Sequence, residues 1–526
     1  MFLVILLTCG VLFVINAKTC YVRTDGNNSN TGLYNTPTGA FKTIKFAFSK
    51  LTAGDTLYIA DGTYYEYQAR LAIPGGSKTV RTTIKSINKW GAKIVLDASG
   101  TTTGLQFLTN GIIFDGFEVT WKADPTAAHV GVGFEKNWIT IRNCNIHHCP
   151  FGGIQGAYCD NILIENNYLH DNFSKIGTEN GSGVSIWHPE GIEENKGGFN
   201  IIYRNNICYN NWATNNVGNN GRPTDGNGLI VDDFKCSQDK TMKPYPYKTL
   251  VENNLCYSNG GAGISIFSSD NVTVRNNTCY YNGRVLKNYA ECTNLNVGDC
   301  ANNEVYNNIS VSDNTGPNPV TACKVYSDGN NTKLNNNLFC GANAFWTWNT
   351  TTTLTSGTNK GNITNKLVTY PAFINPGIGV PSEVDFHLKS SSPAINKGNN
   401  AFGSETDLDG KIRPQDNTIE MGCYEYLITT GLIQLPHYPA GLTPKVNVYP
   451  NPVTGNSFTI FLNEYSKTCD TSVAIIDLTG KVFYETVIAS QQKEISVPTS
   501  CLPYAGLYMV RITNNKMAFT GKFIKS

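Results

Sequence analysis

The chain has 526 residues, of which 40% are hydrophobic and only 15% are charged. Its 41 lysines and arginines balance 40 aspartates and glutamates, which argues against a general nucleic-acid binder or a protein held on an anionic membrane by charge. This length predicts several domains or one long repetitive body, and the low charge together with 50 glycines favours an all-β protein.

Residues 1–17 are predicted to form a signal peptide. The apolar run from Phe2 to Ile15 spans about 14 residues, which is short for a membrane span but suits the core of an export signal. A short buried strand is the alternative. No other stretch contains the roughly 18 apolar residues that cross a bilayer, so we expect an exported protein with no membrane span.

A helix and a first strand are predicted after this segment. Residues 40–51 carry apolar side chains at helical spacing and suit a cap over the N-terminal end of a repetitive body. Residues 54–59 follow as the first predicted strand.

A short motif that ends in asparagine recurs along the middle of the chain. Ile-Arg-Asn at 141–143 returns 23 residues later as Ile-Glu-Asn at 164–166, and Val-Glu-Asn at 251–253 returns after the same interval at 274–276. Repeats of this length with alternating apolar residues and tight corners predict a β-solenoid. The corner asparagines are predicted to adopt left-handed backbone geometry and to form one ladder of amides. They are Asn143, Asn166, Asn205, Asn253 and Asn276.

The cysteines fit the same repeat. Cys208, Cys256 and Cys279 occupy matching places, so we expect stacked buried thiols there, whereas Cys292 and Cys300 lie in a loop-like stretch and could pair.

The N-terminal motifs resemble those of a known group of secreted proteins. Tyr-Val-Arg-Thr-Asp-Gly-Asn at 21–27, Phe-Lys-Thr-Ile at 41–44, Ala-Gly-Asp-Thr at 53–56 and Asp-Gly-Thr-Tyr at 61–64 resemble the opening of pectate-lyase-like proteins. The resemblance covers residues 18–427 and implies a right-handed parallel β-helix with an N-terminal cap helix.

The C-terminal part differs in character. Residues 428–443 contain prolines and no repeat, which predicts a linker, and residues 444–526 carry alternating strands of their own. Val-Tyr-Pro-Asn-Pro at 448–452, Ile-Asp-Leu-Thr-Gly at 476–480 and Gly-Leu-Tyr at 506–508 resemble the sorting domain of type IX secretion. The resemblance implies a small β-sandwich handled by that machinery and a secreted or cell-surface protein. A generic binding sandwich is the alternative.

Insertions indicate where a site lies, because solenoids carry function where coils lengthen on one face. The interval between corner asparagines grows from 23 residues to 39 and then 48. The excess falls in residues 171–200, 210–227 and 234–247, which are predicted to build the walls of one groove.

Aligned strands give the groove a floor. Residues 183–188, 228–233 and 263–268 begin with glycine and alternate, so Trp187, Asp232 and Phe267 are predicted to project outward at steps of roughly 4.8 Å. An acid between two aromatic rings suits sugar binding, with Trp187 and Phe267 as platforms. A purely structural aromatic ladder is the alternative.

Three aspartates surround this floor. Asp232 is the predicted catalytic acid or base, and Asp225 and Asp233 are candidate oxygen ligands for Ca²⁺, which would bridge a uronate carboxylate. Because Asp-Gly is a turn signal, Asp225 could instead be only a turn former.

Basic groups complete the predicted site. His188 is the preferred base, since its pKa begins nearest neutrality, and Lys235 is a second catalytic candidate whose pKa would have to be lowered. Arg222 is predicted to bind substrate.

The same stretch loosely resembles a strand of family-nine polysaccharide lyases. Asp-Gly-Asn-Gly at 225–228 is followed by Asp-Asp-Phe-Lys at 232–235, although residues 259–263 lack the second acidic cluster of those enzymes. The resemblance implies an enzyme that cleaves a uronate polysaccharide such as pectate by Ca²⁺-assisted β-elimination. We expect it to be a monomer. A glycoside hydrolase with paired aspartates and a non-catalytic, glycan-binding or adhesive β-helix are the alternatives.

Overall fold

The structure is a computed structural model in two compact units, Met1–Tyr426 and Leu427–Ser526. It describes residues 17–66, 70–72, 76–97, 104–122, 130–173, 181–212, 225–284, 293–313, 320–326, 331–348, 359–426, 447–461, 471–477, 481–488, 492, 494–514 and 517–526. The predicted signal peptide (apart from Ala17), the predicted linker, Arg222 and Cys292 therefore lie outside the described residues.

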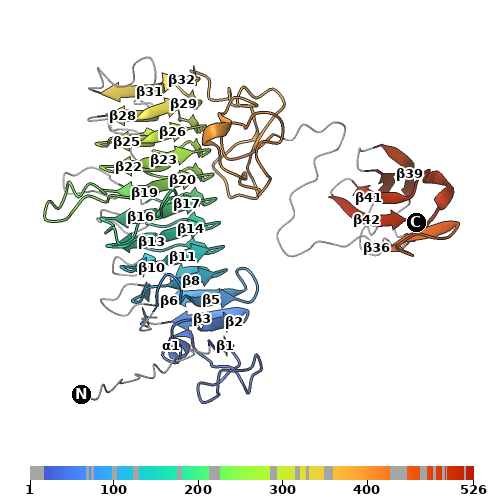
Figure 1. The fold of residues 1–526 in the computed structure, drawn as a ribbon, viewed down its shortest axis with the longest axis horizontal. Helices are drawn as coiled ribbons and strands as arrows, with labels where there is room; N and C mark the ends of the chain where they lie inside the picture. The colour runs from blue at the N-terminus through green and yellow to red at the C-terminus, as the bar shows by residue number, and fades with distance from the viewer. Residues whose placement is uncertain are drawn as a thin grey trace, which may run out of the picture. The chain divides into compact units, whose positions relative to one another are not determined.

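The first unit is a parallel β-helix in which each turn adds one strand to each of three long sheets (Figure 1). Sheet 1 contains β1 (Thr19–Val22), β2 (Thr56–Ile59), β5 (Thr82–Ser86), β8 (Ile112–Asp115), β11 (Ile139–Arg142), β14 (Ile162–Glu165), β17 (Ile201–Arg204), β20 (Thr249–Glu252), β23 (Val272–Arg275), β26 (Glu304–Tyr306), β29 (Lys333–Asn335) and β32 (Asn359–Lys360).

Sheet 2 is the sheet that carries the predicted groove floor. It contains β4 (Arg70–Leu71), β7 (Leu105–Phe107), β10 (Val130–Phe134), β13 (Gly152–Ala157), β16 (Ser182–Trp187), β19 (Asn227–Asp232), β22 (Ile264–Phe267), β25 (Thr293–Gly298), β28 (Thr321–Tyr326) and β31 (Asn343–Trp348).

Sheet 3 contributes the strand that lies between the sheet 1 strand and the sheet 2 strand of a turn. It contains β3 (Gly62–Glu66), β6 (Ala92–Leu96), β9 (Glu118–Trp121), β12 (Asn145–His147), β15 (Tyr168–His170), β18 (Ile207–Tyr209), β21 (Leu255–Tyr257), β24 (Thr278–Tyr280), β27 (Ile309–Val311), β30 (Leu338–Cys340) and β33 (Ile363–Asn365).

The predicted repeat is confirmed as one turn of the β-helix. Ile141 pairs with Ile164 and Val251 with Val274, so residues 23 apart stand one above the other in sheet 1. Alternation sends these apolar side chains inward, where they are fully buried. The three stacked cysteines are likewise paired in register on sheet 3 and buried as free thiols.

The asparagine ladder lies one residue later than predicted. The five predicted corner asparagines do have left-handed φ angles of 54° to 57°, but the amides that bond from turn to turn belong to the residue that follows each of the last four. The left-handed residue makes the corner, so its successor turns inward, where it satisfies buried backbone groups. The ladder is Asn167, Asn206, Asn254, Asn277, Asn308, Asn337 and Asn362.

A second amide ladder, which the sequence reasoning missed, lies at another corner of the β-helix. In this ladder the Nδ2 of one asparagine donates to the Oδ1 of the next at 2.6 to 3.0 Å. Its members are Asn172, Asn211, Asn259, Asn282 and Asn294.

Replacing Asn206 by alanine is expected to lower the free energy of unfolding by about 2–4 kcal/mol. The fully buried Asn206 amide donates to Ile164 O and accepts from Asn167 N, so its loss strands several buried polar groups. Urea denaturation measures the effect. Asn205→Gly is the control, because glycine keeps the left-handed corner at φ 56° without strain, and an equal loss in that variant would contradict the ladder's importance.

The N-terminal end of the β-helix is covered as predicted, by a shorter helix. Helix α1 spans Ile44–Phe48, and the Thr43 side chain accepts a hydrogen bond from Phe46 N at its start. The buried Glu66 carboxylate accepts from Ile44 N at 2.6 Å and ties the helix to β3. Strand β1 precedes the predicted first strand and pairs with it.

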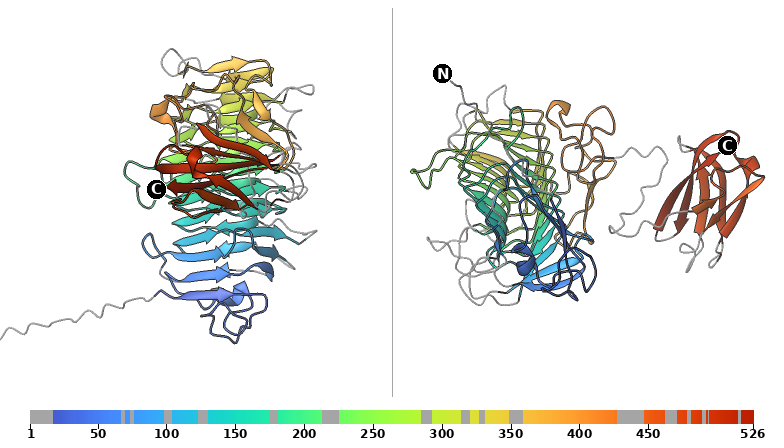
Figure 2. Two further views of the ribbon diagram at one scale, coloured as in Figure 1. Left: turned by 90° about the vertical axis from the view of Figure 1, so that its right-hand side faces the viewer. Right: turned by 60° about the horizontal axis from the view of Figure 1, so that its bottom comes forward.

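Residues 366–426 fold back along the flank of the β-helix and are termed the return segment here (Figure 2, right). The segment contains β34 (Phe373–Asn375), β35 (Asp385–Leu388) and the 3-10 helix η2 (Asn400–Phe402). Its side chains form a second core with sheet 3, in which Phe386 packs against Tyr257 and Tyr280.

The second unit is a small antiparallel β-structure, as predicted. One sheet contains β36 (Asn447–Tyr449), β37 (Ser457–Phe461) and β40 (Glu494–Pro498), and the other contains β38 (Thr471–Ile476), β39 (Val482–Ile488), β41 (Gly506–Asn514) and β42 (Met517–Lys525). A 3-10 helix, η3, spans Thr499–Cys501. Throughout the described parts of the chain, no helix has the length and apolar character of a membrane span.

Candidate active site

The outward row of sheet 2 has the predicted register. Trp187 pairs with Asp232, and Asp232 pairs with Phe267, so the three side chains stand on successive strands β16, β19 and β22. Their inward neighbours, among them Ile186 and Val231, are fully buried. The alternation inferred from the sequence therefore holds along these three strands.

A cavity of about 550 Å³ opens on this face of sheet 2. Strands β7, β10, β13, β16 and β19 contribute to it, and Asp232 comes from the last of them. Gln238, in the predicted insertion 234–247, forms part of the wall. Phe267 is one strand beyond the cavity lining, so its predicted role as a sugar platform stays a prediction.

Asp232 is the ionisable group whose protonation suits catalysis. Burial raises the pKa of its carboxyl to about 8, and the negative charges of Asp225 and Asp233 add to the effect, while a hydrogen bond with Ser185 opposes it. At neutral pH the carboxyl therefore holds its proton. A protonated acid inside a cavity can donate a proton or a hydrogen bond to a ligand.

Trp187 is held in the cavity wall by three contacts. Its indole Nε1 donates to Gln238 Oε1 at 3.3 Å, and its ring meets Tyr158 edge-on with the ring centres 5.6 Å apart. Its other partner is the ring of His188, stacked at 3.6 Å between centres. A half-buried indole fixed in this way is a suitable platform for a sugar ring.

His188 does not reach the cavity surface. Its ring is completely buried, and Nε2 lies 2.6 Å from Asp233 Oδ2. Complete burial keeps the imidazole out of contact with a substrate, so the structure does not support the predicted role of His188 as the base. The pair instead lies behind Trp187 and supports it.

Asp233 also departs from its predicted role. Its Oδ1 accepts hydrogen bonds from Ser237 N and Oγ, and its Oδ2 accepts from Gln238 N in addition to His188. Both oxygens are thus committed to the protein, and the side chain is fully buried.

The predicted calcium site does not fit the residues as they are arranged. Asp233 offers no accessible lone pair, and none of the described residues form a group of three or more carboxylate, imidazole or thiolate side chains that could hold a metal. Asp225 is half-buried, with a left-handed φ of 61° that suits its alternative role as a turn former. Calcium stays a prediction that a chelator tests.

The remaining predicted base also lies outside the cavity lining. Lys235 is half-buried, and its Nζ donates to Asp299 O at 3.0 Å, next to the end of β25. Lys235 does not line the cavity, so its predicted catalytic role has no structural support.

Several uncharged residues of the cavity were missed by the sequence reasoning. Gln106 and Gln155 project from β7 and β13, and Tyr158 follows β13. The signal was present for Gln155, because the segment Gly153-Ile154-Gln155 aligns with the strands that carry Trp187 and Asp232. Glutamine is neither acidic, basic nor aromatic, so the residue types that mark a sugar site did not point to it.

Comparisons with solved structures show proteins of similar fold. Pectate lyase Pel9A is 15% identical, with 78% of this chain and 96% of that chain covered and a TM-score of 0.41. The complex of XylC with xylose is 11% identical, with 78% and 98% covered and a TM-score of 0.39. The A-module of the Azotobacter vinelandii mannuronan C-5 epimerase AlgE4 is 14% identical, with 60% and 87% covered and a TM-score of 0.29. No curated protein sequence matches the chain.

Two family descriptions match the sequence directly. The secretion system C-terminal sorting domain matches residues 447–526, and the chain is thus exported by type IX secretion to the cell surface or beyond. The description "Pel9A-like, right handed beta helix region" matches residues 20–308, which is more than half of the chain and covers the whole cavity lining. The match agrees with the three parallel sheets and gives the β-helix its right-handed sense. The chain therefore belongs to the Pel9A-like right-handed β-helix family.

Proposed function

We propose that this protein is a polysaccharide-cleaving enzyme whose active site is the cavity on sheet 2. The observation that carries the proposal is the carboxyl of Asp232, which holds a proton at neutral pH beside the fixed indole of Trp187. A cavity with one perturbed acid, aromatic rings and amides has the composition expected of a sugar-processing site.

The reaction we favour is β-elimination on a uronate-containing polysaccharide such as pectate. A protonated Asp232 can give its proton to the glycosidic oxygen as the C–O bond to the departing sugar breaks. In the same step, water would take up the hydrogen next to the uronate carboxylate, and a C=C bond would form in the sugar ring. Trp187 would hold the sugar ring against this acid. The family membership and the similarity of residues 225–235 to family-nine lyases support this reaction over others.

Glycoside hydrolysis is the second candidate, and a specific observation favours it. The charge of Asp225 contributes to the raised pKa of Asp232, so a second carboxyl group acts on the one that holds its proton. Such a pair is the usual acid and base of a glycosidase, in which the protonated carboxyl delivers its proton to the glycosidic oxygen.

Absorbance and reducing-end assays distinguish the two reactions. The full chain would be incubated with a panel of uronate polysaccharides, with and without EDTA, beside Asp232→Ala. For a lyase we expect ultraviolet absorbance from the unsaturated product, lost in the variant, and sensitivity to EDTA would show a need for calcium. New reducing ends without that absorbance would show a hydrolase. Binding without either product would contradict an enzyme and support an adhesive β-helix.

A further inference from the structure

We propose that the part of the cavity over β7, β10 and β13 is a subsite for an uncharged sugar unit. This unit would bind next to the sugar unit on which Asp232 acts as the acid. The inference rests on the proposed function, because it assigns the neighbouring unit of the same polysaccharide. It assigns an uncharged sugar as the ligand of the cavity strands that precede Asp232 in the sequence.

Two glutamines form the polar floor of this subsite. Gln106, Gly133 and Gln155 occupy one outward row of sheet 2, paired strand to strand. A Cβ atom at Gly133 would lie 2.2 Å from Gln106 Nε2, so the Gln106 amide extends across the space that a larger residue on β10 would fill. The glycine therefore lets two amides approach one surface, and each amide can both donate to and accept from sugar hydroxyls.

Tyr158 and Trp187 form the side of the subsite next to Asp232, and Phe151 lies at the opposite end of β13. Tyr158 and Trp187 meet edge-on, and Phe151, itself edge-on to Phe173, lies at the start of the same turn. All three cavity rings are half-buried, so each has surface free to cover the apolar C–H face of a sugar. The amides match the hydroxyls of an uncharged pyranose, and the aromatic rings match its apolar C–H face.

The charges exclude an acidic unit from the same space. Among the described residues that line the cavity, the ionisable side chains are Glu135, Tyr158 and Asp232, and none is a lysine, arginine or histidine. A uronate carboxylate placed here would lose water and meet acidic groups without a cation in the lining. In the proposed elimination the uronate therefore binds at the β16–β19 end of the cavity, beside Trp187 and Asp232, and away from Glu135.

Binding to a cleavage-deficient full chain tests this assignment. In an Asp232→Asn background, calorimetry would compare neutral probes (xylo-, galacto- and cello-oligosaccharides) with oligogalacturonate and oligomannuronate. We expect Gln155→Ala to weaken binding of a neutral probe by about tenfold, and Gln155→Lys to strengthen binding of an acidic probe by a similar factor. Asn296→Lys is the matched control, because Asn296 lies in the same outward row but outside the cavity lining.

The outcomes separate this inference from the proposed function. Failure of every neutral probe to bind, or an equal effect of the lysine at positions 155 and 296, would overturn the subsite. Neutral binding that depends on Gln155, together with no cleavage by the wild-type chain, would keep the subsite and overturn the enzymatic function.

Discussion

Replacement of Asp232 by asparagine is expected to lower the rate of polysaccharide cleavage by about 10²–10⁴-fold, because the amide cannot transfer a proton. The isostere keeps the outward position between Trp187 and Phe267 in the register of sheet 2, so the fold and ligand binding are expected to persist. The turnover number and the Michaelis constant are the measurements. Asp239→Asn, a change in the insertion 234–247 outside the cavity lining, is the control and should leave both nearly unchanged.

The same carboxyl makes activity depend on pH in a definite direction. With a pKa of about 8 in the folded chain, Asp232 is protonated through neutral pH, so a rate that needs the acid form falls as pH rises through about 8. If the pH profile of the wild-type chain lacks this alkaline limb, Asp232 is not the acid.

Stability also depends on the protonation of Asp232. The folded chain holds this proton more tightly than the unfolded chain, in which an aspartate has a pKa of roughly 4. The stabilisation from the bound proton is complete below about pH 4 and is lost as pH rises toward 8. Asp232→Asn lacks this loss, so the variant should gain stability relative to wild type between acid and alkaline pH. Urea denaturation across that range checks the sign, and parallel curves would contradict it.

The repeat was predictable because each turn uses one sequence pattern. The 23-residue interval and the alternation of apolar residues placed Ile141 over Ile164 and sent Trp187 and Asp232 to the same outward row. The resemblance carried by the N-terminal motifs and by residues 448–508 correctly gave the β-helix and the sorting domain. Local periodicity thus fixes which strand lies above which, since a slip of one residue would turn the apolar side outward.

The side-chain directions at strand ends were not predictable in this way. His188 and Asp233 follow the last residues of β16 and β19 and have left-handed φ angles of 44° and 53°. Alternation no longer applies after such a turn, and both side chains fold inward to meet each other. The asparagine ladder was misplaced by one residue for a related reason, because the residue after a left-handed corner is the one that turns into the core.

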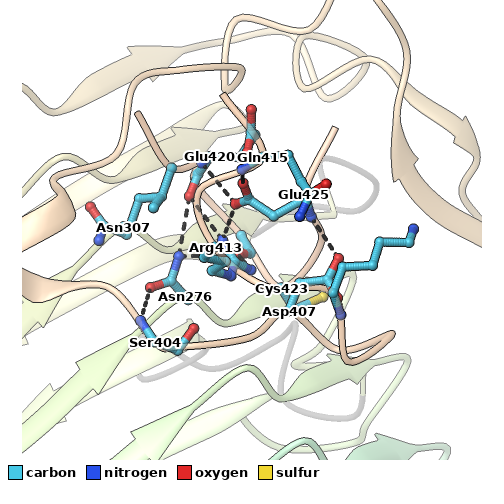
Figure 3. Close-up of polar contacts among 12 residues, drawn as sticks. Asn276, Asn307, Ser404, Asp407, Arg413, Gln415, Glu420, Cys423 and Glu425 are labelled. Atoms are coloured by element: carbon cyan, nitrogen blue, oxygen red, sulfur yellow. Dashed lines mark hydrogen bonds and ion pairs between the residues drawn. The ribbon is translucent and has the colours of Figure 1, made fainter. Parts of the chain in front are cut away.

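Replacement of Arg413 by methionine is expected to destabilise the return segment by about 3–5 kcal/mol, because it would leave a buried carboxylate without its counter-charge. Figure 3 shows the cluster, in which Arg413 Nη1 lies 2.7 Å from Glu425 Oε1. Both side chains are fully buried in the contact. Arg413 Nη2 also donates to Gly422 O, so the guanidinium fixes the backbone of the same segment.

A neighbouring glutamate provides the matched control. Burial, followed by the hydrogen bond and charge of Glu425, raises the pKa of Glu420 to about 9, so Glu420 is already uncharged at neutral pH. Glu420→Gln therefore removes little charge and should change the free energy of unfolding by less than about 1 kcal/mol. Equal losses in Arg413→Met and Glu420→Gln would show that shape, and not the ion pair, holds the cluster.

The order in which segments lose protection from hydrogen exchange gives a second, independent test of Arg413→Met. Asn276 on the sheet 1 side donates to Glu420 O, and Cys423 N donates to Thr278 Oγ1 on β24, so the cluster joins the return segment to two sheets of the β-helix. Loss of Arg413 should therefore release the return segment before the three long sheets unfold. Hydrogen exchange is expected to increase first at residues 385–426, with the amides of β20 and β23 still protected. Simultaneous loss of protection in the segment and in those strands would mean that the two unfold as one cooperative body.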